Sequence, residues 1–215
     1  MEEIIIRPYS KEDRELVRDI AYETAFLGDS ADIYFDDKEL LADILTLYFT
    51  DYQPDSCFVA VSNNEVIGYL LGSKDISLLS KYFNWKIIFK LLFKAIRRNV
   101  FLKTKNTVFL INLIKSLLKG EFKSPDFSKD YPAVLHVNIK ENYRNQGFGS
   151  RMIDLYLQYL KKENVSGVHF STLSDKAAHF YEKLGFVLLH KTKRSYFKNI
   201  LHRDVTCYAY GKKIT

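Results

Sequence analysis

The chain has 215 residues, 47% of them hydrophobic, and a formal net charge of +6. This length predicts one domain, or one domain with an insertion, and the apolar content excludes a wholly disordered protein. Cys57 and Cys207 are the only cysteines, too few for a disulfide framework and without metal-ligand spacing, so we expect no metal site.

The first part of the chain mixes β-like and helical patterns. EIIIRPY at residues 3–9 predicts a strand, and the apolar spacing in residues 13–26 and 37–50 predicts two helices. SCFVAVSNNEVIGYLLGS at residues 56–73 predicts a hairpin, because its two central asparagines tolerate the positive φ of tight turns. The acidic N-terminal sequence does not fit a secretory signal, so we expect a cytoplasmic protein.

Basic charge is concentrated in residues 81–120, which contain ten Lys or Arg and no Asp or Glu. Since the whole chain carries +6, the other residues carry −4. The spacing of Lys86, Lys90, Lys94 and Arg97 predicts an amphipathic basic helix, and residues 107–120 predict a second helix that ends at Gly120. A bilayer span needs about 20 apolar residues, so we expect neither helix to cross a membrane.

Two interpretations of this basic segment are open. It could bind nucleic acid or an anionic membrane, or it could pack its apolar face on the sheet or on a second subunit and leave its lysines in water. We favour packing, because no aromatic-glycine RNA motif or zinc spacing accompanies the charge. Nucleic-acid binding is therefore not expected, whereas a homodimer through this segment stays open.

The last part of the chain predicts a strand at 133–139, a helix at 148–163, a strand at 167–172 and a short helix at 174–184. Two further strands follow at 186–194 and 204–214. Helices and strands in this order predict an α/β fold.

A glycine-rich loop, RNQGFGS at residues 144–150, joins the strand at 133–139 to the next helix. Amides at a helix N-terminus are unpaired and carry partial positive charge, and glycine leaves room for an anion. The dinucleotide fingerprint fails because Met152 replaces its third glycine, and the Walker loop fails because no Gly-Lys-Ser/Thr follows. From the loop alone, a simple turn and a phosphate site both stay open.

Two motifs carry a resemblance to a known family. VLHVNIKENYRNQGFGSRMIDLYL resembles the acetyl-CoA-binding motif of the GNAT superfamily of N-acetyltransferases, with Arg144, Gly147 and Gly149 at the signature positions. AAHFYEKLGF resembles the closing motif of that superfamily, with Tyr181 at its tyrosine. The resemblance implies a mixed, mostly antiparallel sheet of six to seven strands, flanked by helices and splayed between its fourth and fifth strands.

The same resemblance implies one N-acetyltransferase domain over residues 1–215, with a basic helical insertion at about 76–130. Acetyl-CoA is its implied cosubstrate, with the pyrophosphate on the loop amides and the pantetheine arm on the backbone of the preceding strand. Ser174 stands where the family often has an asparagine that contacts the pantetheine arm. The implied acetyl-CoA contacts are Val137, Asn138, Ile139, Arg144, Asn145, Gln146, Gly147, Phe148, Gly149, Ser150 and Ser174.

Acetyl transfer to an amine needs a group that protonates the leaving thiolate and a group that accepts the proton of the amine. Tyr181 resembles the general acid of the family, although an aromatic core residue is the alternative. His136 and His169 are candidate bases, although a lone histidine in a strand is more often a hydrogen-bonded structural residue.

We therefore predict an enzyme that transfers the acetyl group of acetyl-CoA to a primary amine of a small-molecule or peptide acceptor. The acceptor is predicted to carry a negative group, because a basic insertion at the edge of the cleft would attract one. The alternative is a catalytically weak acyl-CoA-binding or interaction module. It stays open because Val134 and Asn138 stand where one subgroup of the family has a histidine and an aspartate.

Overall fold

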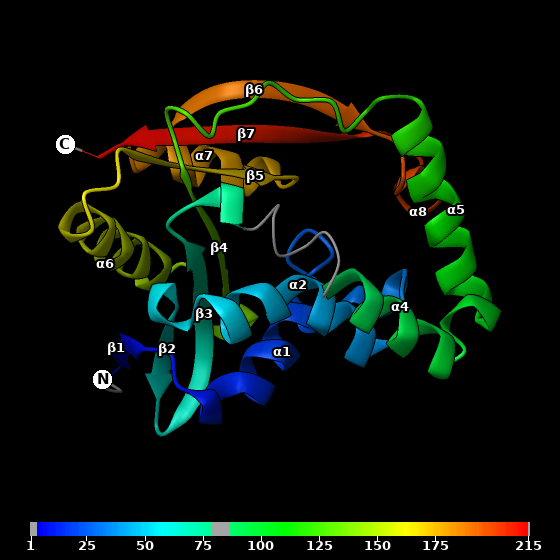
Figure 1. Cartoon of the computed structure of the whole chain (residues 1–215), viewed down its shortest axis with the longest axis horizontal. Coiled ribbons are helices and arrows are strands. Elements are labelled where there is room, and N and C mark those ends of the chain that lie inside the picture. Colours follow the sequence, from blue (N-terminus) through cyan, green and yellow to red (C-terminus); the bar gives the residue numbers. More distant parts are fainter. Residues whose placement is uncertain (1–3, 79–86, 215) are drawn as a thin grey trace.

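The computed structural model describes residues 4–78 and 87–214. One seven-stranded sheet runs through it in the order β1-β2-β3-β4-β5-β7-β6 (Figure 1), and every neighbouring pair is antiparallel except β4 and β5. This confirms the expected mixed, mostly antiparallel sheet. The strands are β1 (Ile4–Pro8), β2 (Phe58–Ser62), β3 (Glu65–Ser73), β4 (Ala133–Ile139), β5 (Gly167–Thr172), β6 (Val187–Arg194) and β7 (Val205–Lys213).

Helices cover both faces of the sheet, as an α/β fold requires. The helices are α1 (Arg14–Glu23), α2 (Lys38–Tyr52), α4 (Ile88–Arg97), α5 (Thr104–Leu118), α6 (Phe148–Lys162), α7 (Asp175–Lys183) and α8 (Lys198–Leu201). On one face, α6 buries Met152, Tyr156 and Leu160 against β2, β3 and β4. On the other face, α1 buries Val17 and Ile20 against β2 and β3. Burial of apolar surface at about 25 cal/mol per Å² makes these two cores the main source of stability.

The sheet splays between β4 and β5, as expected. These strands pair only at Ala133 with Val168 and at Val134 with His169, whereas β4 stays paired with β3 as far as Ile139. From residue 135 onward, the edge of β4 that faces β5 therefore has no strand partner in the described part of the chain. A strand edge of this kind leaves backbone N–H and C=O groups available to a ligand.

The basic insertion contains α4, the short 3-10 helix η5 (Val100–Leu102) and α5. These elements lie at the end of the molecule opposite both termini (Figure 1). Leu91 of α4 and Phe109 of α5 pack against a third core that includes Tyr34 and Phe197. Lys86, one of the four basic residues that predict the first helix, lies outside the described residues. Among residues 4–78 and 87–214, no helix is long and apolar enough to cross a membrane.

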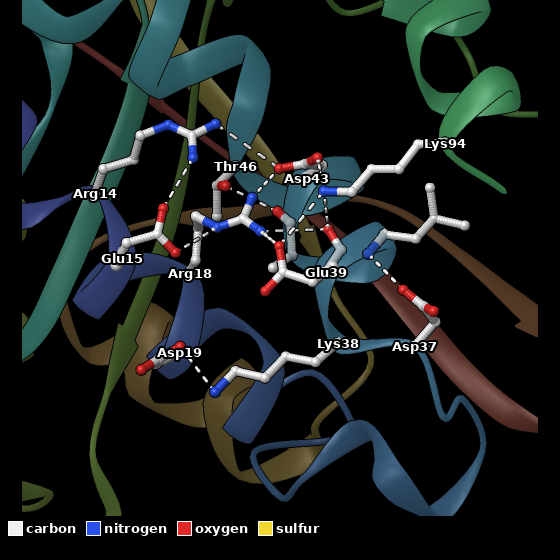
Figure 2. A network of polar contacts seen from close by, with 12 residues as sticks. Arg14, Glu15, Arg18, Asp19, Asp37, Lys38, Glu39, Asp43, Thr46 and Lys94 are labelled. Carbon is white, nitrogen blue, oxygen red and sulfur yellow. Dashed lines mark hydrogen bonds and ion pairs between the residues drawn. The ribbon is translucent and has the colours of Figure 1, made fainter. Parts of the chain in front are cut away.

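The expectation that the insertion packs its broad apolar face on the protein's own sheet is wrong for α4. Phe89, Leu92, Phe93 and Ile96 of this helix are exposed. The opposite side of α4 faces the protein: Leu91 and Ala95 pack into the third core, and Lys94 binds the carboxylates of Asp43 and Glu39 of α2 (Figure 2). The sequence shows the amphipathic pattern but does not show which face has a partner.

The carboxylates of α2 make the charged side of α4 the better one to bury. Asp37 is 1% exposed; it caps α2 by accepting the Leu40 amide and binds Arg98 of the insertion at 2.8 Å. Asp43 is 5% exposed and binds Arg18 of α1 as well as Lys94. A buried carboxylate without a cation is strongly destabilising. These ion pairs therefore fix the orientation of α4.

Candidate active site

The loop between β4 and α6 adopts the conformation that an anion site needs. Asn145 and Gly147 both have positive φ, 62° and 83°, and Gly147 is the N-cap of α6. A Cβ built on Gly147 would meet no atom within 4 Å, so the space beside it is open. The left-handed backbone favours glycine at this position, and the open space leaves access to the amides that follow.

Six successive backbone amides, those of residues 145–150, donate to no partner within the described residues. The first amide of α6 that is bonded is that of Arg151, which donates to the Gly147 carbonyl at 3.1 Å. Unpaired N–H groups at a helix N-terminus carry partial positive charge. The loop therefore offers several unpaired donors to a phosphate-like group, as its sequence predicts.

Helix α7 lies next to this loop. A Cβ at Gly149 would lie 3.5 Å from the Phe180 ring, so the first turn of α6 contacts α7. The Ser174 hydroxyl accepts the Ala177 amide at 3.3 Å and caps α7. This capping role was not predicted, and the expected contact of Ser174 with the pantetheine arm stays a prediction.

Arg144 has a structural role that the motif does not show. Its guanidinium donates to the Ile139 carbonyl at 3.0 Å and to the Gly28 carbonyl at 2.5 Å. It thereby ties the end of β4 to the loop after α1. The Gln146 side chain is also bound locally, to the Asn142 carbonyl at 3.0 Å. Contacts of these two side chains with acetyl-CoA stay predictions, and in this structure their polar atoms bind the protein backbone.

Tyr181 is 7% exposed and lies in an aromatic cluster, with its ring centroid 4.2 Å from that of Phe170 and 5.1 Å from that of Phe180. Burial raises the pKa of its hydroxyl, so the group stays protonated at neutral pH. No residue of the described chain hydrogen-bonds to this hydroxyl, whereas the neighbouring Tyr210 donates to Glu182 at 2.7 Å. The Tyr181 proton is therefore free to be donated to a ligand.

Three polar side chains meet on the face of the sheet that α1 and α2 cover. The Asn138 amide donates to the Tyr69 hydroxyl at 2.8 Å and lies 3.3 Å from Nε2 of His136, while the Tyr69 hydroxyl lies 3.5 Å from Nδ1 of that ring. Burial lowers the pKa of His136 to about 4. The ring is therefore neutral at pH 7 and held in a fixed orientation.

Sequence analysis missed Tyr69 and expected Asn138 to contact the cofactor through the strand. The structure brings the two together because they are opposite each other in the β3–β4 register. Val137 and Ile139, by contrast, pack toward the core under α6, so the side chain of Asn138 lies on the opposite face from theirs. A hydroxyl within the apolar sequence VIGYLLG is the one signal that could have indicated Tyr69.

His169 occupies the last residue pair before the splay, and its ring is held by the backbone. Its Nδ1 lies 2.6 Å from the Tyr131 carbonyl, and its ring contacts Phe127 edge-on. Burial is the main cause that lowers its pKa. The structure thus gives His169 a structural hydrogen bond, the alternative that the sequence left open, and its catalytic role stays a prediction.

A cavity of about 660 Å³ opens between the loop after α1 and the segment that follows β4. Thr24 lines this cavity and also interacts with the Tyr69 hydroxyl, so the cavity adjoins the cluster around His136. Its charged lining is mostly acidic: Glu23, Asp29, Glu65 and Glu141, with Lys140 and Arg144. The described residues contain no group of three or more His, Cys, Asp or Glu that could hold a metal ion.

Solved structures with the same fold include several whose names state that they are acetyltransferases. The chain matches the crystal structure of SsHAT with a TM-score of 0.72 at 23% identity, covering 99% of both chains. It matches Ard1 from Thermoplasma volcanium with a TM-score of 0.55 at 18% identity, covering 99% of this chain and 98% of that one. It also matches a polyamine N-acetyltransferase from Drosophila melanogaster, which forms N-acetylagmatine. The TM-score is 0.57 at 14% identity, covering 98% of this chain and 100% of that one. At these identities the likeness establishes the fold.

A search of curated proteins finds no match to the chain. The sequence profile of the acetyltransferase (GNAT) family, however, matches residues 24–186, which include β4, the glycine loop, Tyr181 and the insertion. The splayed strands, the loop amides and this match agree with one another, and the chain belongs to the acetyltransferase (GNAT) family.

Proposed function

We propose that this protein is one catalytic domain, residues 1–215 with an insertion, that transfers an acetyl group from acetyl-CoA to a primary amine of a small-molecule or peptide acceptor. The observation that carries the proposal is the set of unpaired amides at residues 145–150, beside the unpaired edge of β4. Family membership supports the acyl transfer itself. The non-catalytic alternative finds no support in the structural matches.

The residues present fit acetyl-CoA. The amides of Asn145 to Ser150 would hold the pyrophosphate, and the backbone of Val137 to Ile139 would pair with the pantetheine arm. When bound, acetyl-CoA supplies the acetyl group as an activated thioester. A side chain at Gly147 would enter the open space beside these amides, which is a direct way to test the fit.

Tyr181 is the proposed proton donor to the sulfur that leaves. Its hydroxyl is protonated at neutral pH, free of a protein partner within the described chain, and carried by a helix that contacts the loop helix. A thiol has a pKa of about 8.5 and a phenol about 10, so a nearby phenol can stabilise a thiolate by donating to it. Phe170 and Phe180 fix the ring and exclude water from it.

His136 is the proposed acceptor of the amine proton, on the other face of β4. Because its pKa is about 4, the ring is neutral above pH 5 and can accept a proton at any physiological pH. Such a base is weak, so it takes the proton only as the new bond makes the amine nitrogen acidic. Tyr69 and Asn138 hold the ring, and Thr24, which interacts with Tyr69, also lines the acidic cavity.

The charge of the acceptor stays a prediction. The predicted basic rim, which was the reason to expect a negative acceptor, is partly neutralised in the structure. Lys94, a main contributor to the predicted basic rim, is bound to Asp43, and Arg98 is bound to Asp37. The cavity that adjoins His136 has more carboxylates than cations. An acceptor with a second amine would therefore bind this cavity better than one with a negative group.

The proposal is tested by measuring CoA and acetyl-CoA binding calorimetrically and by following thiol release with a panel of amines. Gly147→Glu should abolish CoA binding, because it places a carboxylate beside the amides. Gly120→Glu is the matched control: Gly120 also has positive φ, but it lies at the end of α5, and binding should persist. Unchanged CoA affinity in a folded Gly147→Glu protein would contradict the placement.

Tyr181→Phe separates chemistry from binding. Loss of a general acid should lower kcat about tenfold to a few hundredfold while CoA affinity stays nearly constant. Tyr210→Phe removes a hydroxyl from the same aromatic cluster, one that is bonded to Glu182, and should leave kcat within about twofold. Full activity of Tyr181→Phe would contradict the proton-donor role and leave this residue with a packing role alone.

A further inference from the structure

The outer face of the insertion is apolar over both of its helices. On α4, Ile88, Phe89, Leu92, Phe93 and Ile96 recur at intervals of three and four residues, so they share one face, and all are exposed. Phe93 is 66% exposed. Helices with this many exposed apolar side chains on one face usually contact a partner or a membrane.

Exposed apolar side chains also occur after α4. Phe101 and Leu102 of η5 are exposed, Leu102 by 80%, at the corner between the helices. On α5, the exposed apolar side chains also recur at helical intervals. They are Val108, Ile111, Ile114, Leu117 and Leu118.

This exposure is built into the fold by the ion pairs on the inner side of α4. Rotating the helix to bury Phe93 would take Lys94 away from Asp43 and Glu39 (Figure 2). The buried Asp43 carboxylate would then keep its arginine partners alone and lose one of its charge-assisted hydrogen bonds. Arg98 holds the end of the helix on Asp37 in the same way. The apolar face therefore cannot turn inward without breaking these pairs.

The charges beside this face indicate the kind of partner. Lys90 and Arg97 flank the apolar residues of α4, and Lys115 and Lys119 lie on the exposed side of α5; all four are exposed. The sequence of residues 81–120 contains no Asp or Glu. Two copies meeting through this face would bring cations onto cations, so the pattern disfavours a symmetric dimer. An anionic partner fits it.

We propose that the outer face of α4, η5 and α5 binds the surface of an anionic lipid bilayer. Aromatic and aliphatic side chains on one side of a helix, with Lys and Arg at the border, are what an interfacial helix needs. The aliphatic and phenyl side chains enter the boundary between headgroups and acyl chains, and the four cations meet the lipid phosphates. Because no helix in the described residues is long enough to span the bilayer, the insertion lies in its interface.

The experiment is flotation of the full-length protein with lipid vesicles, using phosphatidylcholine alone or mixed in equal parts with phosphatidylglycerol. The protein should float with the mixed vesicles and stay behind with pure phosphatidylcholine. Phe93→Ser with Ile96→Ser should remove flotation. Val187→Ser with Leu188→Ser is the matched control, since this pair on β6 is also exposed, and flotation should be unchanged.

The cations are tested separately from the apolar residues. Each Lys or Arg near an anionic surface contributes about fivefold to binding. Lys90→Gln with Arg97→Gln should therefore weaken vesicle binding about 25-fold, and added salt should weaken it further. Circular dichroism of each variant shows that the fold is intact.

Four outcomes would overturn the proposal. Equal flotation with pure phosphatidylcholine would remove the role of the anionic headgroup. A dimer that the Phe93→Ser, Ile96→Ser protein loses, without vesicle binding in the parent, would make this face a subunit interface. Binding of RNA that depends on Lys90 and Arg97 but not on Phe93, again without vesicle binding, would make it a nucleic-acid surface. A monomer that binds no vesicle would leave the face without the proposed partner.

Discussion

Helices α6 and α4 are both amphipathic and basic, yet they bury opposite sides. In α6, Met152, Tyr156 and Leu160 face the sheet, and Arg151 and Lys161 face solvent. In α4, Lys94 faces the carboxylates of α2, whereas the aromatic side faces outward. The difference lies in the neighbour: α6 meets the apolar face of β2 to β4, whereas α4 meets the carboxylates of α2. An amphipathic pattern thus defines two faces, and the surface beside it decides which one is buried.

Removal of the apolar anchor of α6 should have the largest effect on stability. Tyr156 is fully buried, and its hydroxyl donates to the Val134 and Ser73 carbonyls. Tyr156→Ala should lower the free energy of unfolding by about 3 to 5 kcal/mol, because it leaves a cavity and unpaired carbonyls. Urea denaturation measures the change. A loss below about 1 kcal/mol would mean that α6 is not held by this anchor.

Removal of Asp43, the buried carboxylate that anchors α4, should lower the free energy of unfolding by nearly as much. Asp43→Ala leaves the Arg18 and Lys94 charges without this carboxylate and should cost about 3 kcal/mol of unfolding free energy. Asp19→Ala is the control, since Asp19 and Lys38 form an exposed pair at 2.8 Å, and its cost should stay within about 0.5 kcal/mol. Equal costs for the two variants would show that burial adds nothing to the pair on α4.

His136 provides a third case, because it is a half-buried basic group without a carboxylate partner. Its pKa falls from 6.5 in the unfolded chain to about 4 in the folded protein, so the unfolded state binds the proton first. Stability from the neutral ring is complete above pH 6.5 and is lost as pH falls toward 4. Between these limits the parent should lose roughly 2 to 3 kcal/mol more than His136→Gln in urea titrations. Parallel pH profiles of the two proteins would contradict the depressed pKa.

The smallest effect is expected on the outer face of α4. Leu92→Ser should change the free energy of unfolding by no more than about 0.5 kcal/mol, because this side chain contributes little to the folded core. Ile153→Ser at a fully buried position of α6 should cost several-fold more. If Leu92→Ser proved as costly as Ile153→Ser, the outer face of α4 would have a partner within the protein.

The sequence was sufficient for the elements that bury apolar faces in the usual way. The strands at 133–139 and 167–172 have the predicted bounds, and the helix expected at 148–163 ends one residue earlier. Alternating and helical periods follow burial, so they locate such elements well. The splay between β4 and β5 was predicted from the family resemblance, because the spacing of apolar residues does not indicate it.

The candidate site was predictable where backbone chemistry defines it, and less so where side chains meet across the fold. The Gly147 loop follows from local sequence, because positive φ and helix-start amides are local properties. The Tyr69–His136 contact depends on strand register, and the bond from Arg144 to Gly28 joins segments far apart in the chain. The orientation of α4 depends on carboxylates of α2, whose distance from it the sequence does not show.

The narrow junction between β4 and β5 also has a consequence for local opening. Strand pairing joins the half-sheet β1–β4 to the half-sheet β5–β7 at only two residue pairs; α1 and α6 pack on the first half, and α7 packs on the second. Amide hydrogen exchange should therefore resolve two cooperative units, with their boundary near Val134. Any ligand that bridges the two halves would slow exchange in both units together.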